Sequence, residues 1–286
     1  MVTISVDKKR RQHLQQLHTA THILNYAAQK ILGNHIWQHG SNLKEDTGSL
    51  DITHYKQLTY EEIFEIETLV QEIIFKKQDV YIEEVERTAA EQKYGFRLYQ
   101  GGAIPQRKLR VVHVGKFDIE ACGGLHVGNS SEIGLFKIVN TSKLQDGVIR
   151  VEYKVGEFAY RFIQEQQQQL YNTARELSVD WKSTSNTALK FFKEWKEQKK
   201  LIEQLEKSIF ELHTSQISKL DLKGEVEYEI SDSLSMKLLQ ELFELGKSKH
   251  NQFTLITSNL ILSTQDSILH KYKKQIKRGE FYQYIL

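Results

Sequence analysis

The 286-residue sequence contains one cysteine, Cys122, one proline, Pro105, and no long run of apolar residues. A single cysteine cannot form a disulfide within the chain, and an isolated cysteine most often packs as a small apolar side chain. The low proline content argues against a proline-rich linker. Because no window approaches 18 uninterrupted apolar residues, we expect no transmembrane helix, and no apolar run follows the basic N-terminal residues as in a secretory signal. We therefore expect a cytoplasmic protein without membrane contact.

Charge is balanced over the whole chain but unevenly distributed along it. The 39 Lys and Arg residues and 37 Asp and Glu residues leave a formal net charge of +2. Basic residues gather in three clusters, which either bind the phosphates of a nucleic acid or form solvated faces offset by nearby acidic residues. The clusters are Lys8, Lys9, Arg10 and Arg11; Arg107, Lys108 and Arg110; and Lys271, Lys273, Lys274, Lys277 and Arg278.

Residues 1–156 combine two long helical patterns with several strand patterns. Apolar residues recur every three or four positions over 12–32 and 59–78, which predicts two amphipathic helices, the second capped by Thr59. The remaining segments are predicted as an extended, turn-rich stretch over 35–55, strands at 80–85, 109–114, 134–141 and 148–155, and a short helix at 88–94. These residues therefore predict an α+β domain with a mostly antiparallel sheet and helices on one side.

From residue 157 the pattern becomes helical. After a helix over 157–177, apolar residues over 188–212 alternate steps of three and four for about three and a half heptads. We expect residues 157–218 to form a helical hairpin or coiled coil, in which the 188–212 stripe packs on the preceding helix of the same chain. The alternative is that the stripe pairs with a second copy in a homodimer.

Residues 219–286 predict a small third unit of mixed α/β structure. Short apolar segments at 226–230, 253–257 and 260–262 predict strands, and residues 236–245 predict a helix. A basic helix is expected from about residue 266.

Two histidine-containing motifs could supply one metal site. His18 and His22 are four residues apart on the first predicted helix, so both can face one ion. Cys122 and His126 are also four apart, across a pair of glycines that permits a tight turn. One thiolate and three imidazoles suit tetrahedral zinc. The two motifs are about 100 residues apart in sequence, which suggests a site built around a pocket rather than a compact structural zinc site.

The other histidines show no comparable pattern. His35 and His39 lie in a segment predicted to be extended, where their spacing separates them by about 13 Å, so we expect no shared ion. His13, His54 and His113 are expected to be ordinary surface or core residues. Thr19 follows His18 where helical metalloproteases of the H-E-x-x-H type need a glutamate as general base, which excludes that class.

Several motifs occur in an order that is similar to the editing domain of archaeal alanyl-tRNA synthetases. They are His18-Thr-Ala-Thr-His-Ile-Leu24, Leu32-Gly-Asn-His-Ile-Trp-Gln38 with Gly40-Ser41, Leu50-Asp-Ile-Thr-His-Tyr55, Leu98-Tyr-Gln-Gly-Gly-Ala-Ile-Pro105, Cys122-Gly-Gly-Leu-His126 and Glu132-Ile-Gly-Leu-Phe-Lys-Ile138. The resemblance covers residues from about 10 to 156. It also implies that the later helices and a shortened C-terminal globular unit follow the editing domain.

The resemblance implies hydrolysis of the ester that links a wrong amino acid, serine or glycine, to the terminal adenosine of tRNA(Ala). It implies that His18, His22, Cys122 and His126 bind one Zn²⁺ per chain and that Gln38 is important for editing. Leu125 stands where the family usually has threonine, so a hydroxyl near the site is lost. Our candidates for the substrate pocket are Thr21, Gln38, Asp51, Gly123 and Gly124; Asp51 and Glu120 are weaker candidates for a general base. Candidates for tRNA contacts are Lys8, Lys9, Arg10, Arg11, Arg107, Lys108, Arg110, Lys273, Lys274 and Lys277.

The sequence contains no ATP-binding or aminoacylation motif and no P-loop. We therefore expect that the chain does not charge tRNA by itself. It is either a piece of a longer synthetase or one half of a split synthetase, in which a separate chain carries the aminoacylation domain. Two alternatives stay open. The chain could be a non-catalytic tRNA-binding or assembly subunit with a structural zinc, or an unrelated metallohydrolase.

Overall fold

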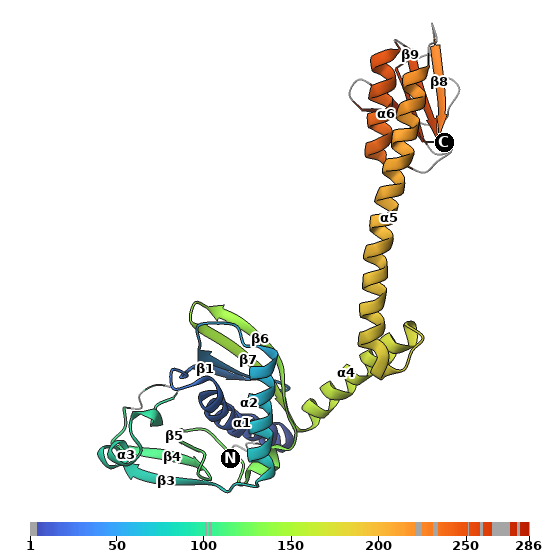
Figure 1. Cartoon of the computed structure of the whole chain (residues 1–286). Coiled ribbons are helices and arrows are strands. Elements are labelled where there is room, and N and C mark those ends of the chain that lie inside the picture. Colours follow the sequence, from blue (N-terminus) through green and yellow to red (C-terminus); the bar gives the residue numbers. More distant parts are fainter. Residues whose placement is uncertain are drawn as a thin grey trace. The chain divides into compact units, whose positions relative to one another are not determined.

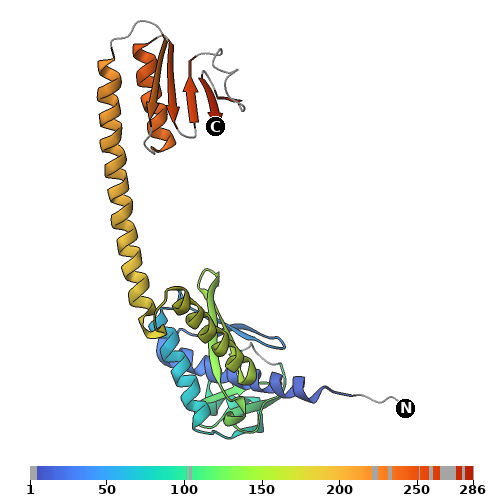
Figure 2. The ribbon, with the colours of Figure 1, turned by 90° about the vertical axis from the view of Figure 1, so that its right-hand side faces the viewer.

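The computed structural model describes residues 5–100, 102, 105–220, 225–230, 234–250, 252–257, 260–264, 275–278 and 281–285. The chain forms two compact units, residues 1–172 and 173–286 (Figures 1 and 2). This division falls inside a helix, and the predicted boundaries at 156 and 218 stay a prediction. Among the described residues, no helix is both long and apolar enough to cross a bilayer.

The first unit is built on a long helix, α1 (Lys8–Leu32), and an antiparallel sheet. Asp7 caps α1 by accepting a hydrogen bond from the backbone N–H of Arg10. The sheet has the strand order β1-β2-β7-β6. Its strands are β1 (Gln38–Leu43), β2 (Gly48–Thr53), β6 (Phe136–Gln145) and β7 (Val148–Val155). The helices α1 and α2 (Tyr60–Phe75) share one apolar core with the inward side chains of this sheet. Because the apolar side chains of α1 are buried in this core, the polar residues of α1 lie on the remaining face of the helix.

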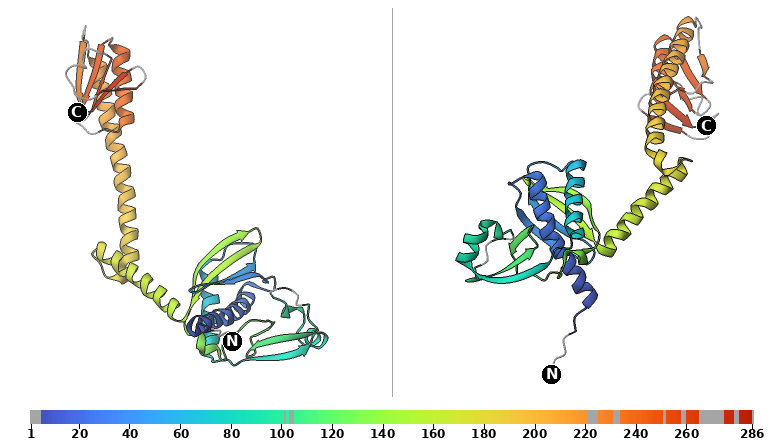
Figure 3. Two further views of the ribbon diagram at one scale, coloured as in Figure 1. Left: turned by 180° about the vertical axis from the view of Figure 1, so that it is seen from behind. Right: turned by 60° about the horizontal axis from the view of Figure 1, so that its bottom comes forward.

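A smaller antiparallel sheet forms the other side of the first unit (Figure 3). It has the order β3-β4-β5, with β3 (Val80–Glu86), β4 (Lys108–Val114) and β5 (Asp118–Ala121). The short helices α3 (Arg87–Tyr94) and η1 (Phe96–Leu98) are packed on it around Ala90, Leu98, Leu109 and Val111. The 3₁₀ turn η2 (Ser130–Ile133) connects β5 to β6. The observed α+β class with antiparallel sheets agrees with the sequence prediction.

Two helices continue the chain after β7, α4 (Gly156–Glu176) and α5 (Thr184–Lys219), joined by the 3₁₀ turn η3 (Trp181–Ser183). The predicted stripe maps onto α5, and several of its side chains are exposed, namely Phe191, Trp195, Ile202, Leu205 and Leu212. Most of the preceding helix, α4, belongs to the other compact unit, so packing of the stripe on that helix stays a prediction. Pairing with a second copy stays a prediction.

The C-terminal end of α5 packs with the last part of the chain. Ile209 and Ile217 join the core of a five-stranded sheet of order β11-β12-β10-β9-β8 and the helix α6 (Met236–Lys249). The strands are β8 (Glu225–Ile230), β9 (Gln252–Thr257), β10 (Leu260–Ser263), β11 (Gln275–Arg278) and β12 (Phe281–Ile285). Among the strand pairs that the structure describes in this sheet, only β8–β9 is parallel.

The basic helix expected from about residue 266 is wrong where the chain is described. Residues 275–278 and 281–285 pair as antiparallel strands, and β12 also pairs with β10. The aromatic and β-branched residues of 281–285 favour a strand, which outweighs the helical charge pattern read from the lysines. Lys273 and Lys274 lie outside the described residues, and Lys277 is on β11.

Candidate metal centre and substrate pocket

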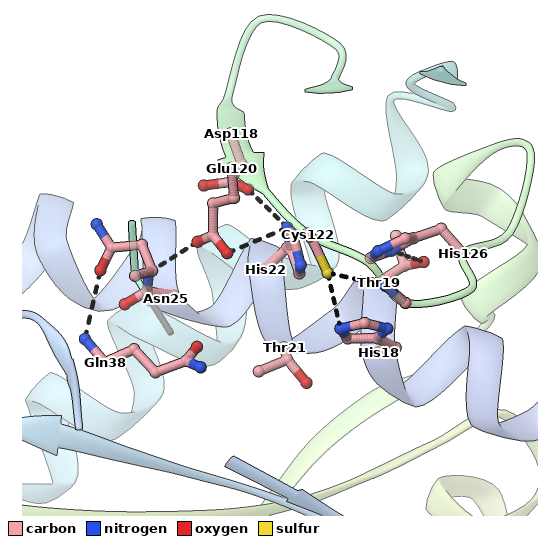
Figure 4. A network of polar contacts seen from close by, with 12 residues as sticks. His18, Thr19, Thr21, His22, Asn25, Gln38, Asp118, Glu120, Cys122 and His126 are labelled. Atoms are coloured by element: carbon pink, nitrogen blue, oxygen red, sulfur yellow. Dashed lines mark hydrogen bonds and ion pairs between the residues drawn. The ribbon is translucent and has the colours of Figure 1, made fainter. Parts of the chain in front are cut away.

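The structure brings the two histidine motifs together. His18 and His22 lie one turn apart on α1, and Cys122 and His126 lie in the loop that follows β5 (Figure 4). One potential ligand atom from each of the four residues lies within 4.8 Å of the other three. The Sγ atom of Cys122 is 3.4 Å from Nε2 of His18. The α1 positions are fixed by the buried apolar face of that helix, so half of this cluster sits on a rigid element.

The Nδ1 atom of each imidazole is held by an oxygen atom. Nδ1 of His18 is 3.2 Å from the carbonyl oxygen of Leu125, which can only accept a hydrogen bond, so this nitrogen is the donor. Nδ1 of His22 lies 3.0 Å from a carboxylate oxygen of Asp118, which identifies it as the donor in the same way. In both rings Nε2 is therefore the nitrogen left for a ligand bond when the ring is neutral.

The third imidazole follows the same rule through a hydroxyl group. Thr19 Oγ1 donates its only proton to the backbone carbonyl of Gln15, so it accepts from Nδ1 of His126 at 3.2 Å. It also accepts from the backbone N–H of Val127. Nε2 of His126 is buried without a hydrogen-bond partner among the described residues. A buried, unpartnered nitrogen beside a thiol and two imidazoles fits a metal ligand.

The electrostatics of the cluster also suit a cation. Burial of the Cys122 thiol opposes its ionisation, but the neighbouring His126, His18 and His22 side chains outweigh burial and lower the pKa of Cys122 to about 3. Burial lowers the pKa of His126 to about 4, so its ring is neutral near pH 7. A thiolate and a neutral imidazole are the forms that bind zinc. Cys122 and His126 are therefore in forms that bind zinc, and the four donor side chains lie close enough together to hold one ion.

Two buried carboxylates, Asp118 and Glu120, contact His22 of the cluster. Asp118, Glu120 and Cys122 alternate along the chain at β5, so they point to one face. Burial and the neighbouring Asp118 carboxylate raise the pKa of Glu120 to about 8. Burial acts to lower the pKa of His22, but Glu120 and Asp118 favour the charged ring, and the result is a raised pKa. Glu120 also accepts a hydrogen bond from Nδ2 of Asn25.

Three of these supporting residues were missed in the sequence: Thr19, Asn25 and Asp118. The spacing Asp118-x-Glu120-x-Cys122 is a signal that could have found Asp118, because alternate residues of a strand share a face. No spacing in the sequence marks Thr19, because its hydrogen bonds are with His126 and Val127, more than 100 residues away. Glu120 contacts His22 and Asn25, and these contacts account for it without a role as general base.

The two glycines of the ligand loop differ in what they permit. Neither has a positive φ angle, so the tight-turn argument from the sequence does not explain them. A Cβ atom added at Gly124 would lie 2.0 Å from Cε1 of His18, whereas one added at Gly123 would meet nothing within 4 Å. Gly124 is therefore needed because the backbone approaches the His18 ring closely, and Gly123 is not.

The other pocket candidates are placed differently. Gln38 begins β1 beside the cluster, and its side chain extends toward it (Figure 4). Its backbone N–H donates to Oε1 of Gln100, while its half-buried side-chain amide has no hydrogen-bond partner among the described residues. Thr21 turns toward the core, where its hydroxyl contacts the Tyr153 hydroxyl at 2.6 Å. Asp51 forms a two-point ion pair with Arg150, so the structure does not bring it to the cluster.

The substituted position, Leu125, acts through its backbone. Its carbonyl oxygen holds His18, and its side chain is exposed. The leucine side chain lines a cavity of about 390 Å³ together with Val6, Asp7, Arg10, Arg11, Leu14 and Gln15. The change from threonine therefore keeps the contact to His18 and makes this cavity wall apolar.

The basic clusters in the first unit have separate surroundings. Lys8, Lys9, Arg10 and Arg11 form the exposed first turn of α1, and Arg10 and Arg11 border the Leu125 cavity. Arg107 is exposed and forms an ion pair with Glu86, and Lys108 is exposed on β4. Arg110 instead donates to the carbonyl oxygen of Cys122 at 2.6 Å. Its position indicates support of the ligand loop.

The remaining histidines have partners away from the cluster. His35 bonds to His54 at 2.8 Å rather than pairing with His39, which is exposed. His113 contacts Glu83, and His13 contacts Gln16.

The contact between Asp118 and His22 has a testable consequence. We expect Asp118→Asn to weaken zinc binding by about 10- to 100-fold, because the amide no longer supplies the negative charge that orients His22 and increases its basicity. Competition against a chelating dye measures the affinity. Asp46→Asn is the matched control, since this exposed aspartate pairs with Lys154 elsewhere. Equal affinities for both variants would contradict a supporting role for Asp118.

Comparison with known proteins places this chain among aminoacyl-tRNA synthetases. Residues 109–152, which include Cys122 and His126, match the family described as threonyl and alanyl tRNA synthetase second additional domain. The alanine–tRNA ligase of Methanococcus maripaludis strain C7 is 39% identical over 279 residues, covering 96% of this chain and 30% of the relative. That of Thermococcus kodakarensis is 42% identical over 221 residues, covering 77% of this chain and 24% of the relative.

The match thus runs along nearly all of this chain but spans only about 30% of the length of the curated relatives. The family predicted from the His18–His22 and Cys122–His126 motifs is confirmed. The chain belongs with the archaeal alanyl-tRNA synthetases and carries their second additional domain.

Proposed function

We propose that this chain hydrolyses the ester bond of mischarged tRNA(Ala), releasing serine and also glycine, with one Zn²⁺ held by His18, His22, Cys122 and His126. The observation that carries the proposal is the convergence of one nitrogen from each of three imidazoles and the Cys122 sulfur beside Gln38, whose side-chain amide has no hydrogen-bond partner among the described residues. Membership of the alanyl-tRNA synthetases supports tRNA(Ala) as the partner. Zinc, when bound, would anchor and polarise the ester end of the substrate.

Gln38 is suited to select the amino acid. A serine side chain differs from alanine by one hydroxyl group, which an apolar synthetic pocket rejects poorly and a hydrogen-bonding pocket recognises well. The Gln38 amide can both donate to and accept from that hydroxyl. Its half-buried position gives such a bond more weight than it would have in open water.

The test is deacylation of Ser-tRNA(Ala) compared with Ala-tRNA(Ala), with and without a zinc chelator. We expect selective loss of the seryl ester that the chelator abolishes. Gln38→Ala should lower kcat/KM for the seryl ester about tenfold, the effect of one lost hydrogen bond, and reduce the preference over the alanyl ester. Gln164→Ala, on the exposed face of α4, is the control. A zinc-loaded chain that leaves both esters intact would refute the proposal.

A second candidate role is assembly without catalysis, favoured by the exposed apolar stripe of α5. In this role zinc only stabilises the fold, and the stripe pairs with a second copy or with a separate chain that carries the aminoacylation domain. This role predicts that Gln38→Ala leaves function intact, which the deacylation measurement decides.

A further inference from the structure

An exposed tryptophan and a half-buried arginine lie next to Gln38. The guanidinium carbon of Arg97 is 5.3 Å from the centre of the Trp37 ring, within the range of a cation–π contact. Trp37 is 37% exposed, although it is a large apolar side chain that directly precedes Gln38. Exposed aromatic rings beside arginine are the usual platform for the bases of single-stranded nucleic acids.

Arg97 is fixed in place without losing its charge. Its Nη1 donates to Oε1 of Gln29 at 2.6 Å, and its Nη2 donates to the carbonyl oxygen of Asn34 at 3.0 Å and to Oδ1 of Asn34 at 3.3 Å. All three acceptors are neutral, and Arg97 forms no ion pair with a carboxylate in the described part of the chain. A rigid guanidinium with its positive charge unpaired is prepared to bind a phosphate.

The same contacts connect this pair to the proposed metal centre. Gln29 continues the polar face of α1 on which His18, His22 and Asn25 lie, at helical steps of four, three and four. It is seven residues beyond His22, or about 10 Å along the helix axis. Gln100 links Gln38 to Arg97: it accepts a hydrogen bond from the backbone N–H of Gln38 and donates one to the backbone carbonyl of Arg97.

We propose that Trp37 and Arg97 bind the 3′-terminal nucleotide of the RNA whose aminoacyl ester lies at the four-ligand cluster. The base stacks on the exposed surface of the Trp37 ring, and Arg97 donates hydrogen bonds to the phosphate of that nucleotide. Gln29, which holds Arg97, lies about 10 Å beyond His22 along the axis of α1, so the cluster and the Trp37–Arg97 pair are displaced along the same helix. This inference rests on the proposed function, because it places the ester at the cluster.

The test is binding of an uncharged single-stranded RNA ending in CCA, followed by fluorescence anisotropy with the zinc-loaded chain. Trp37→Leu should weaken binding by about 5- to 150-fold, the effect of one lost stacking contact. Trp37→Phe should restore most of the affinity because it keeps an aromatic face. Arg97→Gln should weaken binding and reduce the slope of log affinity against log salt by about 0.7. Phe64→Leu on α2 and Arg161→Gln on α4 are exposed controls.

The steady-state kinetics separate this inference from the proposed function. With Ser-tRNA(Ala), Trp37→Leu and Arg97→Gln should raise KM while kcat and zinc content stay unchanged. Active, folded variants whose RNA affinity, salt slope and KM equal those of the unmodified chain would overturn the nucleotide site and leave the hydrolytic proposal standing. If Arg97→Gln does not fold, Arg97→Lys replaces it as a variant that keeps the positive charge. The test of the nucleotide site then depends on Trp37→Leu alone. If the chain binds RNA with the expected effects of these variants and of salt but hydrolyses neither ester, the nucleotide site is supported and only the hydrolytic proposal is contradicted.

Discussion

Cys122→Ala should reduce the affinity of this chain for zinc by more than about 100-fold and abolish deacylation of Ser-tRNA(Ala). Loss of a supporting residue around a metal already costs about 10- to 100-fold, and the thiolate is the only anionic member of the proposed ligand set. Cys122 lies within 4.8 Å of all three imidazole nitrogens, so no other side chain of the set can replace it. Zinc per chain, measured after dialysis against a weak chelator, gives the result directly.

The matched control for Cys122→Ala is His39→Ala, which removes an exposed imidazole of β1 outside the cluster. This variant should keep about the same zinc content and activity. If Cys122→Ala retained both, the cysteine would be an ordinary packed side chain, and the metal centre would need another ligand.

Gly124→Ala should damage the centre as much as removal of a ligand, although the substitution adds only one methyl group. The new Cβ would lie 2.0 Å from Cε1 and 2.4 Å from Nδ1 of His18, so either the ring or the loop backbone must move. Overpacking of this kind typically costs about 1–3 kcal/mol, and here it displaces a ligand from its position. We expect about 10- to 100-fold weaker zinc binding and a similar loss of deacylation.

Gly123→Ala is the control for Gly124→Ala, because a Cβ atom there meets no other atom within 4 Å. The two neighbouring substitutions are chemically identical and differ only in what the methyl group contacts. Equal effects of the two would show that the loop relaxes freely and that the approach of Gly124 to His18 does not control the centre.

Local spacing in the sequence predicted which residues lie together in the cluster. It did not predict the residues whose role depends on tertiary contacts. Positions four apart on a helix share a face whatever the rest of the chain does, so His18 and His22 could be paired without a structure. Thr19 and Asn25 could not be recognised, because their partners lie about 100 residues away in sequence. Gly124 was chosen for the wrong reason, since its value lies in the space it leaves for His18.

The limits of the fold prediction have similar causes. Periodicity showed that residues 188–212 form a helix with an apolar stripe, but periodicity does not reveal what covers a stripe, and several of these side chains are exposed. Near the C-terminus the lysine spacing suggested a helix, whereas residues 275–278 and 281–285 are strands that pair with each other, and residues 281–285 also pair with β10. Charge patterns alone did not separate Arg110, which bonds to Cys122, from Arg107 and Lys108.

The division of the ligands between α1 and the loop after β5 affects how the protein is made. During translation His18 and His22 emerge about 100 residues before Cys122 and His126, and a nascent chain that stops between them holds only half of the site. The proposed zinc site is complete only when β5 has paired with β4 and Arg110 has bound the Cys122 carbonyl. Metal capture would thus mark the completion of this domain, and once formed it would close a long loop whose opening releases considerable chain entropy.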